Sequence, residues 1–238
     1  MQAVDRLVAY WRDLDLSAPP FVHPADQSAL LSFPEFDQNA IPYPYVGDIR
    51  EADVWVLMLN SNIAATDKEH EAQPYLRARL QANLRQELSQ YEHPLLCLDP
   101  ALKHTGTYEY YNRRNGLAKV IAAYAKQTNI GEAAARSEVS RRLAILQLFP
   151  YRSSVGVAAK LLGDALLSVQ YARAAVKESL GERLIIVPRS SRHWGFEYGS
   201  HEPGRLLTYK ADQARTASLI PGGAGGGGDE ILTRLLKQ

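Results

Sequence analysis

Three apolar runs in the chain each end at a cluster of small or polar residues. The runs and the clusters that follow them are 54–59 before 60–62, 143–148 before 149–154, and 184–187 before 188–191. Near-continuous aliphatic runs separated by helical stretches are typical of parallel strands covered on both faces. Ligands of open α/β sheets bind outside the carboxyl ends of such strands. The pattern therefore predicts an α/β fold in which the three polar clusters meet in one crevice.

The length of 238 residues and the supply of aliphatic side chains fit a single α/β domain spanning 1–238. No apolar stretch reaches the roughly 18 residues that cross a bilayer, and the N-terminus lacks a basic region followed by an apolar segment. We therefore expect a cytoplasmic protein with no membrane partner. The one cysteine, Cys97, lies in an apolar run, which excludes an internal disulfide and a cysteine-rich zinc site.

Charge is unevenly distributed along the chain although the formal net charge is only +1. Residues 1–102 contain 7 Lys and Arg against 15 Asp and Glu, whereas residues 103–238 contain 20 against 11. Such asymmetry can indicate an anionic partner for the basic part, such as nucleic acid or a phosphorylated ligand. It can also average out, because the two parts of one domain interleave in space.

Hydrophobic periodicity predicts helices between and around the strands. The expected helices are 3–14, 75–87, 107–127, 132–139, 157–179 and 229–236, with a polar loop at 60–69, a short extended piece at 95–99 and a fourth strand at 205–209. The segment 17–48 is rich in proline and aromatic residues, which favours an extended lead-in. The glycine-rich segment 221–228 is either a mobile loop or a backbone surface close to a ligand.

The first cluster contains two amides, Asn60 and Asn62, at a strand end. A carboxamide can orient a water molecule or bind the donor and acceptor edges of a base or sugar. Asp67 is the nearest carboxylate that could act as a base. The alternative is an Asx-type turn that leads into a helix.

The second cluster combines an aromatic ring, a guanidinium and two hydroxyls in Tyr151, Arg152, Ser153 and Ser154. Arg152 could bind a phosphate while Tyr151 stacks on a base. The alternative places Tyr151 in the core and uses Ser153 or Ser154 to cap the following helix.

The third cluster places Arg189, Arg192, His193 and Trp194 within six positions after a strand. The two arginines could hold phosphates, and a helix beginning near Ser190 or Trp194 could bind an anion at its N-terminus. His193 is a candidate general acid or base, or an incidental polar residue, and Trp194 is expected to anchor the loop.

Common cofactor and catalytic motifs do not occur in the chain. There is no P-loop, no dinucleotide-binding glycine motif, no nucleophile elbow and no zinc-protease motif. Glu69, His70 and Glu71 are adjacent and would face different ways on a helix. The sequence therefore predicts neither a metal nor a cofactor.

The order of these clusters resembles the uracil-DNA glycosylase superfamily, in a divergent branch. The segment Leu59-Asn60-Ser61-Asn62 keeps the asparagine of that family's first motif loop without its proline and glycine. The segments 98–100, 107–111, 148–153 and 187–194 add to the resemblance. The resemblance implies a three-layer α/β/α fold with a short, mostly parallel central sheet, and a role for Asn60 in orienting the attacking water. Ser218 and Gly222 stand where the family's last motif would be.

Three functions follow from the sequence. The leading one is a glycosylase-like protein that takes a nucleobase of DNA out of the stack, with Asn60 positioning water and Arg152, Arg189 and Arg192 holding phosphates. The second is a non-catalytic module that binds a nucleotide or nucleic acid. The third is a hydrolase or transferase of a small phosphorylated metabolite. The oligomeric state stays open.

Overall fold

A computed structural model describes residues 2–64, 66–155 and 165–237 and shows an α/β fold built on a mixed sheet. Within these residues the sheet has six strands in the order β1-β3-β2-β4-β6-β5. The strands are β1 (Tyr45–Val46), β2 (Val54–Asn62), β3 (Leu143–Ser153), β4 (Leu184–Val187), β5 (His201–Glu202) and β6 (Leu206–Thr208). The α/β class and the four expected strands are confirmed, and the edge strands β1 and β5 are additions.

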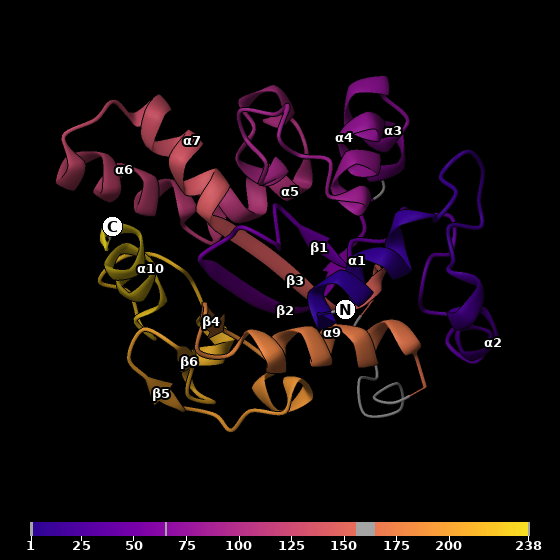
Figure 1. The fold of residues 1–238 in the computed structure, drawn as a ribbon. Coiled ribbons are helices and arrows are strands. Elements are labelled where there is room, and N and C mark those ends of the chain that lie inside the picture. Colours follow the sequence, from indigo (N-terminus) through magenta and orange to yellow (C-terminus); the bar gives the residue numbers. More distant parts are fainter. Residues whose placement is uncertain (1, 65, 156–164, 238) are drawn as a thin grey trace.

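Helices cover both faces of this sheet (Figure 1). Helices α4 (Pro74–Arg85), α6 (Leu117–Thr128) and α7 (Glu132–Arg142) lie on one face, and α9 (Leu167–Ser179) lies on the other. Helix α1 (Ala3–Arg12) contacts both α9 and α4, and α10 (Gly227–Leu236) packs on α6. The shorter helices are η1 (Pro24–Asp26), α2 (Gln27–Leu30), α3 (Asp67–Glu71), η2 (Leu96–Leu98), η3 (Pro100–Leu102), α5 (Gly106–Tyr108), π-helix η4 (Glu109–Arg114), η5 (Ser191–Trp194) and η6 (Gln213–Thr216).

Strands β3, β2, β4 and β6 are parallel neighbours, and only β1 and β5 run antiparallel. Numbered along the chain, the four parallel strands have the order 2-1-3-4. The connection from β2 to β3 runs over the face of α4 and α7, and the connection from β3 to β4 contains α9 on the opposite face. Such a reversal is a topological switch point, and here it lies between the carboxyl ends of β2 and β4.

The lead-in at 17–48 is partly extended, as expected, but it also forms η1, α2 and β1. Its later part runs beside β3, where the Tyr43 amide donates to Pro150 O at 2.8 Å and the Asp37 amide donates to Arg152 O at 2.9 Å. These bonds extend β3 through Ser153, so the cluster expected as a loop at 149–154 is mostly strand. The sequence prediction failed because the pairing partner lies more than 100 positions earlier in the chain.

Other boundaries also differ from the sequence prediction. Of the polar loop expected at 60–69, residues 60–62 instead end β2 and residues 67–69 begin α3, and most of the extended piece expected at 95–99 is the 3₁₀-helix η2. The helix expected at 107–127 is interrupted after the π-helix by Gly116, whose φ of +93° and close neighbour Ile220 both require glycine. The expected helix 157–179 begins, within the described residues, at Leu167; its segment 157–164 lies outside them.

The glycine-rich segment is wrapped tightly around Tyr209. The Tyr209 hydroxyl donates to Ser218 O at 2.5 Å and accepts from the Gly227 amide at 3.2 Å. A Cβ on Gly225 or Gly227 would lie within 2.5 Å of the tyrosine side chain. Glycine is therefore required here by close packing of the backbone against a buried ring.

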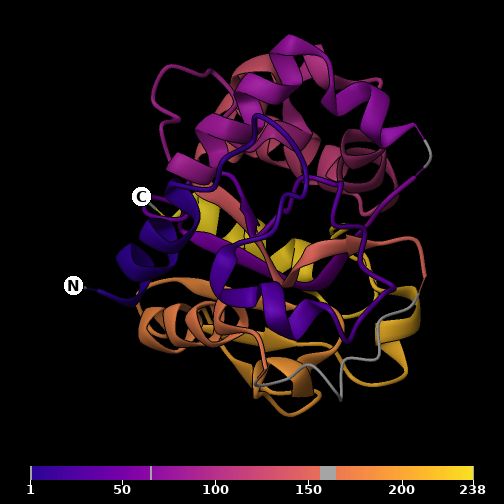
Figure 2. The same cartoon turned by 90° about the vertical axis from the view of Figure 1, so that its right-hand side faces the viewer.

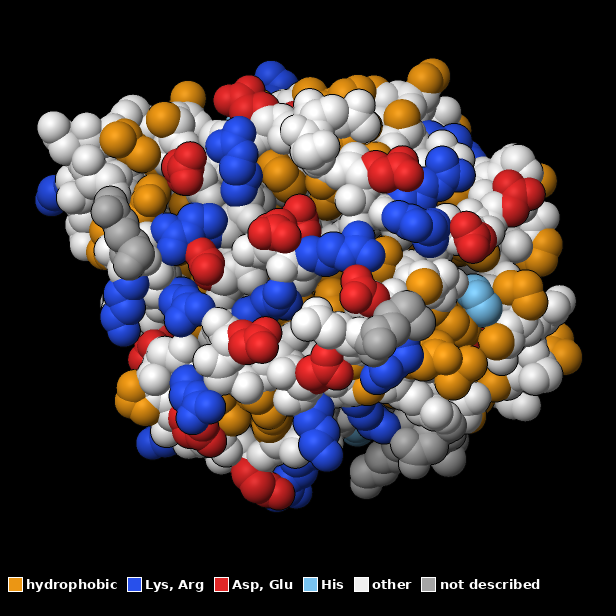
Figure 3. Space-filling view, in the orientation of Figure 1, with side chains coloured by type: hydrophobic (Ala, Val, Ile, Leu, Met, Phe, Trp, Pro, Cys, Tyr) orange, Lys and Arg blue, Asp and Glu red, His pale blue; other side chains and the backbone are white. Residues whose placement is uncertain are grey.

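Two further findings concern the surface and the helices. Acidic and basic side chains alternate across the face drawn in Figure 3, so the charge asymmetry along the chain does not give this face one sign. Figure 2 shows the carboxyl edge of the sheet turned toward the viewer, with the early and late parts of the chain interleaved around it. Among the described residues, no helix has the length and apolar character to cross a membrane.

We predict that Gly228→Ala destabilises the protein by about 1–3 kcal/mol. Alanine normally favours a helix, but here its Cβ would lie 2.4 Å from Leu219 O and 2.5 Å from Pro221 N, and these backbone atoms cannot move aside easily. Urea denaturation measures the change. Gly131→Ala is the control, because a Cβ there meets nothing within 4 Å. Equal stability of the two variants would contradict the packing argument.

Candidate functional site

The indole of Trp194 lies at the switch point, between the diverging ends of β2 and β4. The two strands pair only from Val54 to Val56 and then diverge. Beyond that point Met58 O accepts a hydrogen bond from Trp194 Nε1 at 3.1 Å, in the place that a neighbouring strand would fill. The Trp194 side chain is buried, so it anchors the loop after β4 as the sequence predicted.

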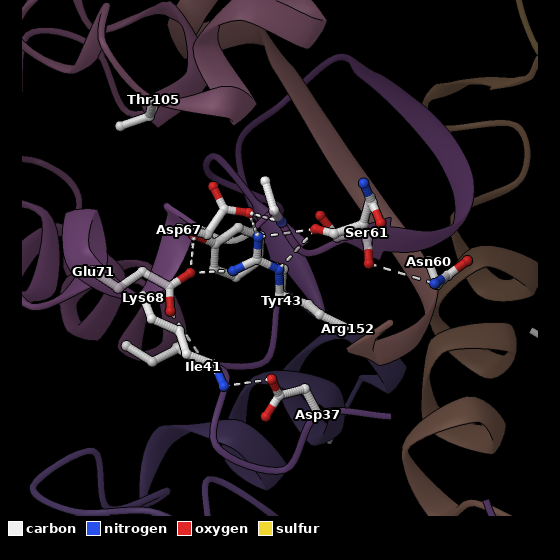
Figure 4. Close-up of polar contacts among 12 residues, drawn as sticks. Asp37, Ile41, Tyr43, Asn60, Ser61, Asp67, Lys68, Glu71, Thr105 and Arg152 are labelled. Carbon is white, nitrogen blue, oxygen red and sulfur yellow. Dashed lines mark hydrogen bonds and ion pairs between the residues drawn. The ribbon is translucent and has the colours of Figure 1, made fainter. Parts of the chain in front are cut away.

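Asn60 lies at this edge with its side chain half-buried. Within the described residues, its carboxamide makes one long hydrogen bond, in which Nδ2 donates to Ser61 O at 3.4 Å (Figure 4). Asn62 is exposed two positions later, and its backbone oxygen is taken by Arg152. The Asn60 carboxamide therefore keeps hydrogen-bonding capacity for a ligand or a water molecule.

The end of β3 is shifted in register against β2. Asn60 pairs with Phe149 and Asn62 pairs with Ser153, so two steps along β2 match four steps along β3. Such a bulge re-aims side chains and is frequent beside functional sites. Every residue of β3 is buried, Tyr151 and Arg152 beyond the shift included.

Tyr151 is a core residue in this structure. Its hydroxyl donates to the buried carboxylate of Asp26 at 2.9 Å, and the same carboxylate accepts from the Leu167 amide at 2.8 Å, at the start of α9. Burial, with the nearby charge of Asp26, raises the pKa of the tyrosine. The expected stacking of Tyr151 on a base is therefore replaced by the core alternative.

Arg152 is 2% exposed and lies at the centre of a buried ion cluster (Figure 4). Its guanidinium pairs with Asp67 at 2.5 Å and with Glu71, and it donates to Asn62 O at 2.9 Å. The Tyr43 hydroxyl donates to Glu71 at 3.0 Å. Three segments that are distant in sequence are thereby joined: the lead-in, the end of β2 with α3, and the end of β3.

The titration of this cluster follows from its burial. Burial raises the pKa of Glu71, against the opposing effect of Arg152 and the Tyr43 hydrogen bond. Burial alone would lower the pKa of Arg152, but the nearby Tyr43, Glu71 and Asp67 outweigh it, so the pKa is raised. The guanidinium is therefore charged and fully engaged, which corrects the sequence-based assignment of Arg152 to phosphate binding and of Asp67 to a free base.

The serines of the second cluster also have structural surroundings. Ser153 is buried, and its hydroxyl donates to Val155 O at 2.8 Å, whereas Ser154 is exposed. In the described residues neither serine caps a helix. The first described amides of α9, those of Leu167 and Ser168, donate instead to the Asp26 carboxylate. Ser154 remains available at the carboxyl edge.

The loop after β4 presents charged side chains to solvent. Arg189 and Arg192 are exposed, and Arg192 pairs with Glu197 at 3.5 Å on the surface. His193 is half-buried, and its backbone oxygen accepts from Arg173 of α9 at 2.8 Å. The expected helix N-terminus is the single 3₁₀ turn η5. The two arginines thus keep the accessibility that phosphate binding requires.

Ser218 and Gly222 have local partners in the glycine-rich segment. Ser218 O accepts from Tyr209, and the Gly222 amide donates to the Asp229 carboxylate at 3.0 Å. The backbone oxygen of Ser218 and the backbone amide of Gly222 are therefore engaged within the chain.

Gln147 is the site residue that the sequence reasoning missed. It is a polar residue within the apolar run of β3, and it is 2% exposed. Its Nε2 donates to the Tyr111 hydroxyl at 3.1 Å, and its Oε1 has no partner in the described part of the chain. The detectable signal was the lone amide in a strand buried on both sides, since a buried polar group normally has all its partners.

Gln147 and Asn60 lie on the same face of the sheet. Met58 is paired with Gln147 and Asn60 with Phe149, so Gln147 is two residues behind the position opposite Asn60. Strand geometry places their Cα atoms about 8 Å apart. Tyr111 belongs to the π-helix η4, an element that is frequent at functional sites. Two amides and a phenol therefore lie together at this end of the sheet.

Comparisons with known proteins give no assignment. No family model, no curated protein and no solved structure matches the chain. Within the described ranges, no group of three or more His, Cys, Asp or Glu side chains has an arrangement that could hold a metal ion. The functional argument therefore depends on the geometry of the carboxyl edge.

We predict that Arg152→Met destabilises the protein by about 3–5 kcal/mol, because the two carboxylates of Asp67 and Glu71 would be left buried without a counter-charge. Urea denaturation at neutral pH measures the loss. Arg113→Met is the control: this arginine is exposed and pairs with Glu109 on the same helix, so its loss should cost less than about 1 kcal/mol. If Arg152→Met has the same urea midpoint as the wild type, the ion cluster does not stabilise the fold, and Arg152 becomes a candidate ligand contact again.

Proposed function

We propose that the chain binds a nucleotide unit of DNA at the carboxyl edge of its sheet and hydrolyses the N-glycosidic bond, with Asn60 orienting the attacking water. The observation that carries this proposal is the pair of amides, Asn60 and Gln147, that share one face of the sheet and keep open hydrogen-bonding positions. A carboxamide presents both a donor and an acceptor, which matches the edge of a nucleobase.

The depth of the two amides supports a division of roles. Gln147 is buried in the sheet and has one bond to Tyr111, so it offers its free oxygen to a base that enters from the carboxyl edge. Asn60 is nearer the mouth and half-buried, where a water molecule has access. A base reaches this depth only after leaving the stack, at a cost of a few kcal/mol.

Arg189 and Arg192 supply the positive charge for the sugar-phosphate backbone. Both are exposed at the switch point, in the loop that Trp194 fixes against β2. The resemblance to the uracil-DNA glycosylase superfamily supports the same proposal, because Asn60 lies near the carboxyl end of the first of the four parallel strands of the sheet. We include in this proposal that the α/β fold is the three-layer α/β/α fold of that superfamily.

A non-catalytic nucleotide-binding module is the second candidate, and one observation favours it. Asp67, the carboxylate that the sequence offers as a base, is engaged by Arg152 in the interior. A carboxamide can orient water but cannot take its proton. Binding without turnover is the outcome expected if no other group serves as the base.

We predict that Asn60→Ala lowers the rate of abasic-site formation in a base-modified DNA oligonucleotide by about a hundredfold, with unchanged stability. The substrates are fluorescent single-stranded, mismatched and uracil-containing oligonucleotides, and alkaline cleavage reveals the abasic sites. Asn39→Ala is the control, since Asn39 is exposed and its hydrogen bond to the Asp37 carboxylate comes from the backbone amide, which alanine keeps. Wild-type cleavage by Asn60→Ala would remove the catalytic role.

The same oligonucleotides separate the two candidates through binding. Arg189→Gln should weaken binding and reduce the slope of log affinity against log salt by about 1, because one phosphate contact is lost. Salt-dependent binding without strand breaks would favour the non-catalytic module. Absence of binding at low salt would contradict both and leave a small phosphorylated metabolite as the ligand to test.

A further inference from the structure

A cavity of about 300 Å³ lies between the residues that follow α9, the later part of the loop after β4, and strands β5 and β6. Its volume equals that of about ten water molecules and is at the lower end of the range for ligand pockets. Apolar side chains line part of it, and charged ones line the rest. The apolar residues are Leu180, Phe196 and Leu206, and the charged residues are Glu197, Glu202 and Arg205.

Arg205 is exposed, and its guanidinium lies beside the backbone of Gly181. A Cβ on Gly181 would be 2.5 Å from Arg205 Nη2, and the φ of +98° at Gly181 independently requires glycine. In the described residues no carboxylate lies within the 4 Å of an ion pair with this guanidinium. Arg205 therefore brings a charge without an ion-pair partner to the cavity.

The acidic side chains at the cavity differ in their engagement. Glu197 pairs with Arg192 at 3.5 Å, and both side chains are largely exposed. Glu202 is exposed in the edge strand β5 and, within the described chain, has no basic partner at ion-pair distance. The cavity thus presents one free cation, one free anion and an apolar surface.

We propose that this cavity binds a free α-amino acid with an apolar side chain. Arg205 binds the carboxylate, Glu202 binds the ammonium group, and the side chain covers Leu180, Phe196 and Leu206. A simple carboxylic acid would face the uncompensated charge of Glu202, and a simple amine would leave Arg205 without a partner. A zwitterion satisfies both groups, and an apolar side chain also removes the cavity wall from water.

Isothermal titration of the full chain tests the proposal with L-leucine and three matched probes. The probe 4-methylpentanoate lacks the ammonium group, 3-methylbutylamine lacks the carboxylate, and glycine lacks the apolar side chain. We expect saturable binding of one L-leucine per chain and at least about fivefold weaker binding of each probe, since each lacks one contact worth about 1 kcal/mol.

Two variants assign the binding to this cavity. Arg205→Gln and Glu202→Gln should each weaken L-leucine binding about fivefold, and both positions are exposed, so folding is preserved. Arg85→Gln, on exposed α4 surface, is the control and should bind normally. The proposal is overturned by absence of saturable L-leucine binding, by equal binding of 4-methylpentanoate, or by an equal effect of Arg85→Gln.

Discussion

The ion cluster around Arg152 is the constraint on which the carboxyl edge depends. The register shift near the end of β2 and β3 interrupts the regular ladder, and the guanidinium of Arg152 replaces the lost pairing by bonding to Asn62 O, Asp67 and Glu71. Because these partners come from α3 and the end of β2, one side chain fixes the separation of two strands and a helix. Removal of a partner would leave charge buried in the interior, which is more costly than the loss of a surface ion pair.

This constraint divides the carboxyl edge into a closed part and an open part. At the end of β3 the polar groups of Tyr151 and Arg152 are satisfied by Asp26 and the ion cluster, so they position other elements. Asn60 on β2 and Gln147 on β3 keep free hydrogen-bonding positions, and Arg189 remains exposed in the loop after β4. The part of the edge with unsatisfied chemistry is the part where an α/β sheet binds its ligands.

Sequence patterns located the strands and several helices well, because burial in parallel strands and periodicity on helices are local signals. They located the site only in outline. Asn60 and the arginines after β4 lie at the predicted edge and stay candidates, but Arg152 was assigned to a ligand although it binds carboxylates of α3. Gln147 was missed within an apolar run. Whether a polar side chain faces solvent or a buried partner depends on segments that are far away in sequence.

The sequence by itself determined the α/β class and the position of the polar clusters at strand ends. The requirement for glycine at positions such as Gly225 and Gly228 was set by the packing around Tyr209 and Leu219, whereas the sequence left the segment as either a mobile loop or a surface close to a ligand. Tertiary structure alone decided which cluster is structural. A charged side chain stays accessible to a ligand only where the fold places no opposite charge beside it. The fold brings Glu71 and Asp67 to Arg152 although they lie 81 and 85 positions away in the sequence.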